Sequence, residues 1–223
     1  AQHKVSRVTG NPVRAEIEAI AEPAQRFAGR TGPLKVLVVG GSLGARALNQ
    51  ALPLALARLF KDVPADRRPR VTHQTGMANL ADVKADYVKA GLDPATDVEL
   101  LPFINNMAQR LADCDLIVCR AGAITVSELC AAGVPSILIP LVVSTTAHQR
   151  DNAEFMAQHQ AAIHLPQTEL SAETLAARLQ SLQRPDLAEM AGRARALARH
   201  QSAAAVADAI EQFVQPSNEK ASA

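Results

Sequence analysis

The sequence predicts an α/β fold in which helices cover both faces of a doubly wound parallel sheet. Six short segments rich in Val, Ile and Leu alternate with stretches of helical spacing, and this is the pattern of buried parallel strands. Two of these segments, 34–39 and 116–119, run directly into glycine-containing turns that open helices. Ligands of such sheets bind beyond the carboxyl ends of the strands, so both turns are expected at the ligand-binding edge.

The first half of the chain is expected to supply four of the strands, at 34–39, 71–74, 98–101 and 116–119. Regularly spaced leucines predict a helix over about 45–60; they are Leu48, Leu52, Leu56 and Leu59. Pro53 lies inside this helix and is expected to kink or split it, because proline removes a backbone hydrogen bond. A second helix should end near Ala90, with Gly91 in the capping position after it.

The second half adds two strands and a series of helices. The strands are expected at 136–140 and 162–165, and the helices at 124–132, 148–159, 171–182, from Pro185 onward, and at 202–214. Gly133 is expected to cap its helix in a left-handed conformation, and Pro135 prevents the helix from continuing. Ser171 is expected to cap the helix that it begins.

Composition excludes several classes of protein. The 223 residues are 48% hydrophobic with a formal net charge of +1, so no basic surface for nucleic acid is expected. Three cysteines without a Cys-x-x-Cys pair indicate a reduced, cytosolic protein. No apolar run approaches the roughly 18–20 residues of a membrane span. The chain starts at Ala1 without Met or a signal peptide, and we interpret it as a fragment of a longer protein.

The glycine turn at 40–44 (Gly-Gly-Ser-Leu-Gly) is suited to a phosphate, because its backbone N–H groups and the next helix N-terminus converge. It matches neither G-x-G-x-x-G nor the Walker pattern. No acidic residue ends the following strand to bind an adenosine ribose, which disfavours an NAD oxidoreductase. Glu128 stands on an otherwise small and apolar helix. It is either a ligand for vicinal sugar hydroxyls or part of an exposed helix face.

Asp113 and Asp115 form an Asp-x-Asp pattern, which in one glycosyltransferase architecture holds a metal-bound nucleotide. Here the two residues straddle a helix end and a strand start, so their carboxylates are not expected on one ion. We therefore expect no metal site.

Six ordered blocks resemble the MurG family of UDP-N-acetylglucosamine transferases. The blocks are 9–14, 40–45, 73–76, 103–107, 120–128 and 148–153. The resemblance covers the C-terminal, donor-binding half of that family. It implies a Rossmann-like domain that forms the C-terminal lobe of a two-lobed, GT-B type glycosyltransferase. It also implies residues 1–20 as a linker between lobes, 21–214 as the nucleotide-sugar-binding domain, and 215–223 as a disordered tail.

The resemblance also implies a role for each block. Ser42 and the backbone of Gly41, Leu43 and Gly44 would meet the diphosphate, together with the helix start at Ala123, Ile124, Thr125, Val126 and Ser127. Ile104 would bind the uracil edge through its backbone, beside Arg14 and Met107. Glu128 would accept from the ribose hydroxyls, and Gln149 and Asn152 would hold the N-acetylglucosamine. No catalytic residue, cofactor or metal is implied in this half.

The implied activity is an inverting transfer that converts lipid I to lipid II in peptidoglycan synthesis. The missing half of the family carries the acceptor site and the membrane contact, which implies a peripheral protein on the cytoplasmic face of the bacterial inner membrane. Alternatives are a UDP-N-acetylglucosamine 2-epimerase or another nucleotide-sugar enzyme on the same scaffold. Taken alone, the fragment would be a non-catalytic module that binds UDP-sugar weakly without turnover.

Overall fold

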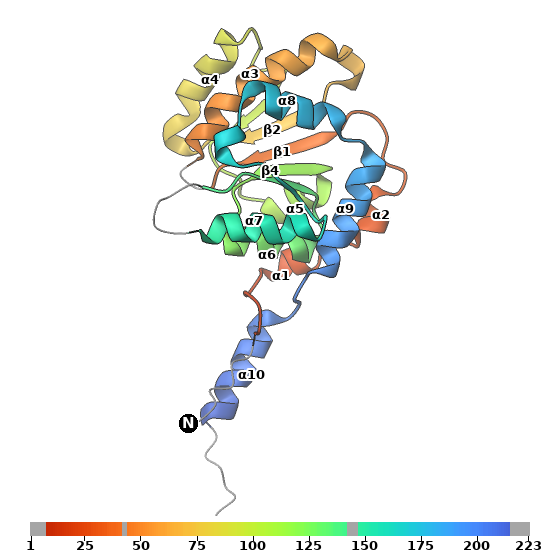
Figure 1. Ribbon diagram of the computed structural model, residues 1–223, viewed down its shortest axis with the longest axis vertical. Coiled ribbons are helices and arrows are strands. Elements are labelled where there is room, and N and C mark those ends of the chain that lie inside the picture. The colour runs from red at the N-terminus through yellow and green to blue at the C-terminus, as the bar shows by residue number, and fades with distance from the viewer. Residues whose placement is uncertain (1–7, 42–43, 142–146, 215–223) are drawn as a thin grey trace, which may run out of the picture.

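The computed structural model describes residues 8–41, 44–141 and 147–214. Within them the predicted doubly wound sheet is confirmed: its six strands are all parallel and lie in the order β3-β2-β1-β4-β5-β6. Figure 1 shows β2, β1 and β4 side by side. The strands are β1 Lys35–Val39, β2 Arg70–Gln74, β3 Glu99–Leu101, β4 Leu116–Cys119, β5 Ser136–Leu138 and β6 Ile163–His164. The strand order reverses between β1 and β4, which are the two strands that end in glycine turns.

The helices form a layer on each face of this sheet. They are α1 Ala15–Glu18, α2 Pro23–Phe27, α3 Arg46–Asp62, α4 Leu80–Lys89, α5 Met107–Asp113, α6 Ala123–Ala132, α7 His148–Gln158, α8 Ala172–Ser181, α9 Arg184–Ala196 and α10 Ser202–Val214. Helices α3, α4 and α8 cover one face, and α1, α5, α6 and α7 cover the other (Figure 1). The long α10 extends away from the body. No helix in the described ranges combines the length and hydrophobicity needed to cross a membrane.

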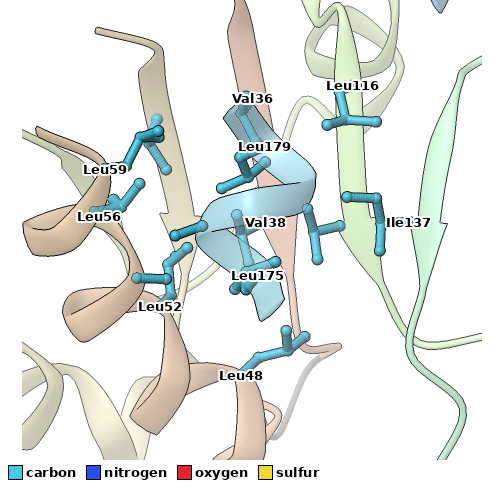
Figure 2. Packing of buried hydrophobic residues seen from close by; sticks show 14 of the residues in the cluster. Val36, Val38, Leu48, Leu52, Leu56, Leu59, Leu116, Ile137, Leu175 and Leu179 are labelled. Atoms are coloured by element: carbon cyan, nitrogen blue, oxygen red, sulfur yellow. The ribbon is translucent and has the colours of Figure 1, made fainter. Parts of the chain in front are cut away.

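The core on the α3 side is aliphatic, as the leucine spacing predicts. Val36 and Val38 of β1 point toward leucines of α3 and α8 (Figure 2). The labelled leucines of these helices are Leu48, Leu52, Leu56, Leu59, Leu175 and Leu179. Leu48, Leu52 and Leu56 have no exposed surface, and burying each contributes roughly 1.5–3 kcal/mol. This burial holds α3 at the sheet, directly after the first glycine turn.

The expectation that Pro53 splits its helix is wrong, because α3 runs unbroken for 17 residues with Pro53 inside it. Proline removes one backbone donor, so the Asn49 carbonyl lacks its usual helical partner. The buried leucines on both sides of Pro53 hold the helix against the sheet, and their burial outweighs that loss.

Helix α1 has no counterpart among the predicted elements, yet its Ile17 is fully buried in the core on the α6 side. The division of the chain at residue 20 therefore stays a prediction, and part of the expected linker lies against the domain. Gly133 caps α6 in a left-handed conformation, as predicted (φ 59°). Ser171 caps α8, and its hydroxyl accepts from the Thr174 N–H. The expected tail at 215–223 lies outside the described residues.

A buried carboxylate connects several segments at the amino-terminal edge of the sheet through hydrogen bonds. Asp115 is 1% exposed. It accepts hydrogen bonds from Arg30 Nη1 at 2.8 Å, Arg184 Nη2 at 3.1 Å and the Lys35 N–H at 2.9 Å. Burial acts to raise the pKa of Asp115, but these donors outweigh it and hold the pKa below its ordinary value. Asp115 is engaged by two arginines, whereas Asp113 is exposed, so the two carboxylates of the Asp-x-Asp pattern have different surroundings.

Candidate functional site

The first glycine turn connects β1 to α3 at the carboxyl edge of the sheet. Gly44 has φ +76°, and a Cβ atom there would overlap the Thr75 carbonyl oxygen. The turn therefore needs glycine at this position, both for its left-handed backbone and for its close approach to β2. Gly41 and Gly44 lie in the turn as predicted. Ser42 and Leu43 lie outside the described residues, so their predicted phosphate contacts stay predictions.

A buried polar network supports this turn from beneath. Asn49 Nδ2 donates to the Thr75 carbonyl at 3.0 Å, and Asn49 Oδ1 lies 3.1 Å from His73 Nε2. Tyr87 Oη lies 3.2 Å from His73 Nδ1. Since Asn49 Oδ1 can only accept, His73 carries its proton on Nε2 and accepts from Tyr87. Burial lowers the pKa of His73 to about 4, so this neutral form persists at neutral pH.

The second turn connects β4 to α6. Gly122 precedes α6, and the backbone N–H groups of the first helical turn, from Ala123 onward, open toward the same edge. Arg120 comes directly after β4, and its Nη1 donates to the Ile139 and Pro140 carbonyls at 3.1 and 3.4 Å. Burial lowers the pKa of Arg120 from its ordinary value, but a guanidinium stays charged at neutral pH. Arg120 thus places a fixed positive charge beside a helix N-terminus.

The two turns line one cavity of about 680 Å³. Its walls are Gly40, Gly41, Gly44, Ala45, Arg46, Ala47, Gln50, Arg120, Gly122, Thr125, Leu141, Gln149 and Gln167. The structure therefore brings together Gly41, Gly44, Thr125 and Gln149 of the predicted set. A larger hollow of about 850 Å³ lies at the amino-terminal starts of β2 and β3, away from both turns. The smaller cavity lies at both glycine turns and has Arg120 in its wall, which is an arrangement suited to a diphosphate.

The predicted nucleoside end lies beside this cavity. A hollow of about 60 Å³ is lined by Met107, Glu128 and Thr125, and Thr125 also lines the larger cavity. Arg14 donates through Nε and Nη2 to Oε1 of Glu128, at 3.2 and 3.1 Å. Glu128 thus contacts Arg14 and shares a hollow with Met107, and the nucleoside contacts that the resemblance implies for these residues stay predictions. Ile104 is buried in the loop between β3 and α5.

Three of the remaining predicted residues have side-chain hydrogen bonds within the protein. Gln149 Oε1 accepts from the Leu141 N–H at 2.9 Å, and Asn152 Nδ2 donates to the Ala121 carbonyl at 3.0 Å. Both therefore tie α7 to the ends of the neighbouring strands. Ser127 accepts from Asn11 Nδ2 at 3.0 Å and donates to the Ala123 carbonyl. Ile124 is half exposed at the start of α6, and Val126 is partly buried on the same helix. Their predicted ligand contacts stay predictions.

Several residues of the cavity wall were not among the predicted site residues, and Arg120 and Gln167 are the most informative of them. Arg120 was taken only as part of a turn, although a charged residue at the end of a fully buried strand indicates a partner at that edge. Gln167, in the short 3₁₀ turn Gln167–Glu169 after β6, also lines the cavity. Its position gave no signal in the sequence, because only the order of the strands brings β6 to this side.

Comparison with known proteins decides the family. Residues 35–213 match the glycosyltransferase family 28 C-terminal domain. The chain belongs to this family. A curated relative from Chromobacterium violaceum is 66% identical over 92% of this chain and 56% of its own length. A curated relative from Methylibium petroleiphilum is 64% identical over 93% of this chain and 55% of its own length. Both are named UDP-N-acetylglucosamine–N-acetylmuramyl-(pentapeptide) pyrophosphoryl-undecaprenol N-acetylglucosamine transferase.

Solved structures of glycosyltransferases agree with this assignment to family 28. The crystal structure of Acinetobacter baumannii MurG matches with a TM-score of 0.78 and 37% identity, over 88% of this chain and 55% of that chain. The glycosyltransferase VinC, in complex with dTDP, matches with a TM-score of 0.53 at 20% identity and shows the fold alone. These matches confirm the MurG resemblance and the GT-B fold class. The chain spans about half the length of the curated relatives it matches.

Proposed function

We propose that this chain is the UDP-N-acetylglucosamine-binding half of an inverting N-acetylglucosaminyltransferase that converts lipid I to lipid II in peptidoglycan synthesis. The observation that carries the proposal is the single cavity between the two glycine turns, with Arg120 in its wall. The names of the relatives support the donor and the acceptor. Residues 21–214 would form the donor domain, and residues 1–20 would connect it to the preceding lobe.

The chemistry of this half is leaving-group stabilisation. In the transfer, a hydroxyl of the acceptor sugar attacks the anomeric carbon, and the bond from that carbon to the β-phosphate oxygen breaks. Negative charge then grows on UDP. The N-terminus of α6 and the Arg120 guanidinium are in place before the reaction, so they stabilise this charge with little reorganisation. We expect the first glycine turn to add backbone N–H groups.

The other contacts would orient the donor. Glu128, held by Arg14, accepts from the ribose hydroxyls, and the backbone of Ile104 with Met107 holds the uracil. The amide ends of Gln149 and Asn152 that have no hydrogen bond to the described residues would hold the sugar. The proton of the attacking hydroxyl passes to a base in the part of the relatives that this chain does not cover. That part would also bind lipid I and hold the whole enzyme at the cytoplasmic face of the inner membrane.

Calorimetry with UDP, UDP-N-acetylglucosamine and ADP tests the binding half of the proposal. We expect the chain to bind UDP and its sugar at least tenfold more tightly than ADP, without releasing N-acetylglucosamine. Equal affinity for UDP and ADP would contradict the proposal. The full-length parent, given labelled donor and a lipid I analogue, should yield labelled glycolipid. Formation of UDP-N-acetylmannosamine instead would indicate a 2-epimerase.

A further inference from the structure

A buried glutamine joins two loops of the candidate site. Gln74 is the last residue of β2 and is 2% exposed. Its Nε2 donates to the Gly41 carbonyl at 2.9 Å and to the Pro102 carbonyl at 3.1 Å. Gly41 belongs to the first glycine turn, whereas Pro102 directly precedes Phe103 and Ile104. One amide group therefore connects the proposed diphosphate loop to the proposed nucleobase loop.

The position of Gln74 in the sheet explains why this side chain can do so. Strand β2 lies between β1 and β3, so its carboxyl end separates the loops that follow its two neighbours. Successive residues of a strand point to opposite faces. His73 faces α3 and α4 and joins the network beneath the glycine turn, which leaves Gln74 on the face of α5.

The orientation of the amide follows from its partners. Both neighbours are carbonyl oxygens, which only accept, so the NH₂ group must face them. The other end, Oε1, is buried and has no hydrogen-bond partner among the described residues. The connection therefore consists of two hydrogen bonds donated by a single nitrogen. A carboxylate of the same shape cannot replace them, because it has no N–H group.

We propose that Gln74 is a positioning residue that fixes the spacing between the diphosphate loop and the nucleobase loop, so that one nucleotide engages both at once. This inference rests on the proposed function. Gly41 has φ +86°, and a Cβ there would meet nothing within 4 Å. Its carbonyl accepts from the Gly44 N–H at 2.9 Å inside the turn, and the bond from Gln74 connects that same carbonyl to the loop after β3. Gln74 holds this carbonyl relative to Pro102 without contacting the ligand.

Titration of three ligands separates positioning from a structural role. In Gln74→Met, the dissociation constant of UDP should rise about tenfold, because UDP spans both loops. The dissociation constants of uridine and of inorganic pyrophosphate should change less than twofold, because each of these ligands engages only one of the two loops. The matched control is Gln158→Met, at an exposed position at the end of α7, which should change none of the three. Equal weakening of all three ligands would overturn the inference and show a structural role.

Gln74→Glu provides a second, pH-dependent measurement. At pH 8 a carboxylate would face two carbonyl oxygens, and UDP binding should fall more than in Gln74→Met. At pH 5.5 the buried carboxyl group takes up a proton and donates one hydrogen bond. UDP affinity relative to the unmodified chain at the same pH should therefore recover at least threefold. If the ratio of UDP affinities between Gln74→Glu and the unmodified chain is the same at both pH values, the proposed role of Gln74 is wrong.

The outcomes distinguish this inference from the proposed function. If the unmodified chain prefers UDP over ADP but Gln74→Met binds UDP equally well, only the inference is wrong. If the unmodified chain shows no preference for UDP, the proposed function fails and the inference falls with it. Circular dichroism and thermal unfolding check that each variant folds. If neither variant folds, Gln74 is a structural residue and the inference is wrong.

Discussion

Arg14 and Glu128, 114 residues apart in the chain, meet at the edge of the candidate site. Both Nε and Nη2 of Arg14 donate to the same carboxylate oxygen, Oε1, at 3.2 and 3.1 Å. The second oxygen, Oε2, is thereby left to accept from a ligand. The side chain of Glu128 is 18% exposed and that of Arg14 is 47% exposed. We infer that Arg14 orients the carboxylate more than it stabilises the fold.

Glu128→Ala should weaken UDP binding by about 1–3 kcal/mol, because the ribose hydroxyls lose a charged acceptor. The loss should be smaller for 2′-deoxy-UDP, which offers one hydroxyl fewer. Calorimetry with both nucleotides measures the difference. Glu154→Ala, on the exposed face of α7, is the control and should leave both affinities unchanged. An equal loss for the two nucleotides would place Glu128 away from the ribose.

Arg14→Ala should weaken UDP binding less than Glu128→Ala, and the double variant should bind like Glu128→Ala alone. The reason is that Arg14 acts through Glu128, so the two effects are not additive. The free energy of unfolding should change by less than about 1 kcal/mol, because exposed ion pairs contribute little. Additive losses in the double variant would instead show that Arg14 binds the nucleotide directly.

Gly44→Ala should destabilise the protein more than Gly91→Ala. Both glycines have positive φ, but a Cβ at Gly91 meets nothing within 4 Å, whereas one at Gly44 overlaps the Thr75 carbonyl. Each substitution costs about 1 kcal/mol for the left-handed backbone, and Gly44→Ala adds the steric conflict. Urea unfolding measures the stability, and pyrophosphate titration should show lost binding in Gly44→Ala alone. Similar behaviour of the two variants would contradict the close approach of the first turn to β2.

Arg120→Met should reduce the affinity for pyrophosphate and UDP about tenfold or more and leave that for uridine unchanged. A fixed guanidinium beside a helix N-terminus contributes to anion binding in ways that neutral side chains do not replace. Arg178→Met, at an exposed position of α8, is the control. Unchanged pyrophosphate affinity in Arg120→Met would show that Arg120 only fastens the end of β5.

Stability should fall as the pH drops below about 6.5. Burial lowers the pKa of His73 to about 4 in the folded protein, whereas the unfolded chain has a histidine pKa near 6.5. Between these values the unfolded state binds a proton that the folded state does not, so acid favours unfolding. The loss reaches roughly 2 kcal/mol at pH 5 and is absent above pH 7. Urea unfolding between pH 8 and pH 4.5 measures it.

His73→Gln is the matched variant for this pH dependence. Its unfolding free energy should be lower at pH 7, because the Asn49 and Tyr87 contacts are altered. It should lack the part of the pH dependence that His73 causes between pH 6.5 and 4.5. His200, at an exposed position before α10, provides the comparison: His200→Gln should retain the full slope. If the unfolding free energy of His73→Gln still falls with pH between 6.5 and 4.5 as steeply as in the unmodified chain, other groups cause the acid sensitivity.

The strands, the capping glycines and both turns could be predicted from the sequence, because each depends on residues close together in the chain. Pro53 misled the prediction, since the burial that keeps α3 continuous comes from β1 and α8. The sequence also did not reveal that Arg14 holds Glu128 or that Gln74 joins Gly41 to Pro102. These contacts arise only when the order of the strands places distant segments side by side. Short α1 escaped prediction for the same reason, since Ile17 is held by α6 rather than by its own helix.

The buried Asp115, with Arg30 and Arg184, lies at the end of the sheet opposite to both glycine turns. One set of contacts that keeps the domain folded therefore lies apart from the residues that would determine its selectivity. Sequence divergence can then remodel the residues around the cavity while the anchored end preserves the architecture. Anyone redesigning this domain for a different sugar donor should therefore vary cavity walls other than Gly44 and Arg120 and leave that carboxylate and its two guanidinium partners in place.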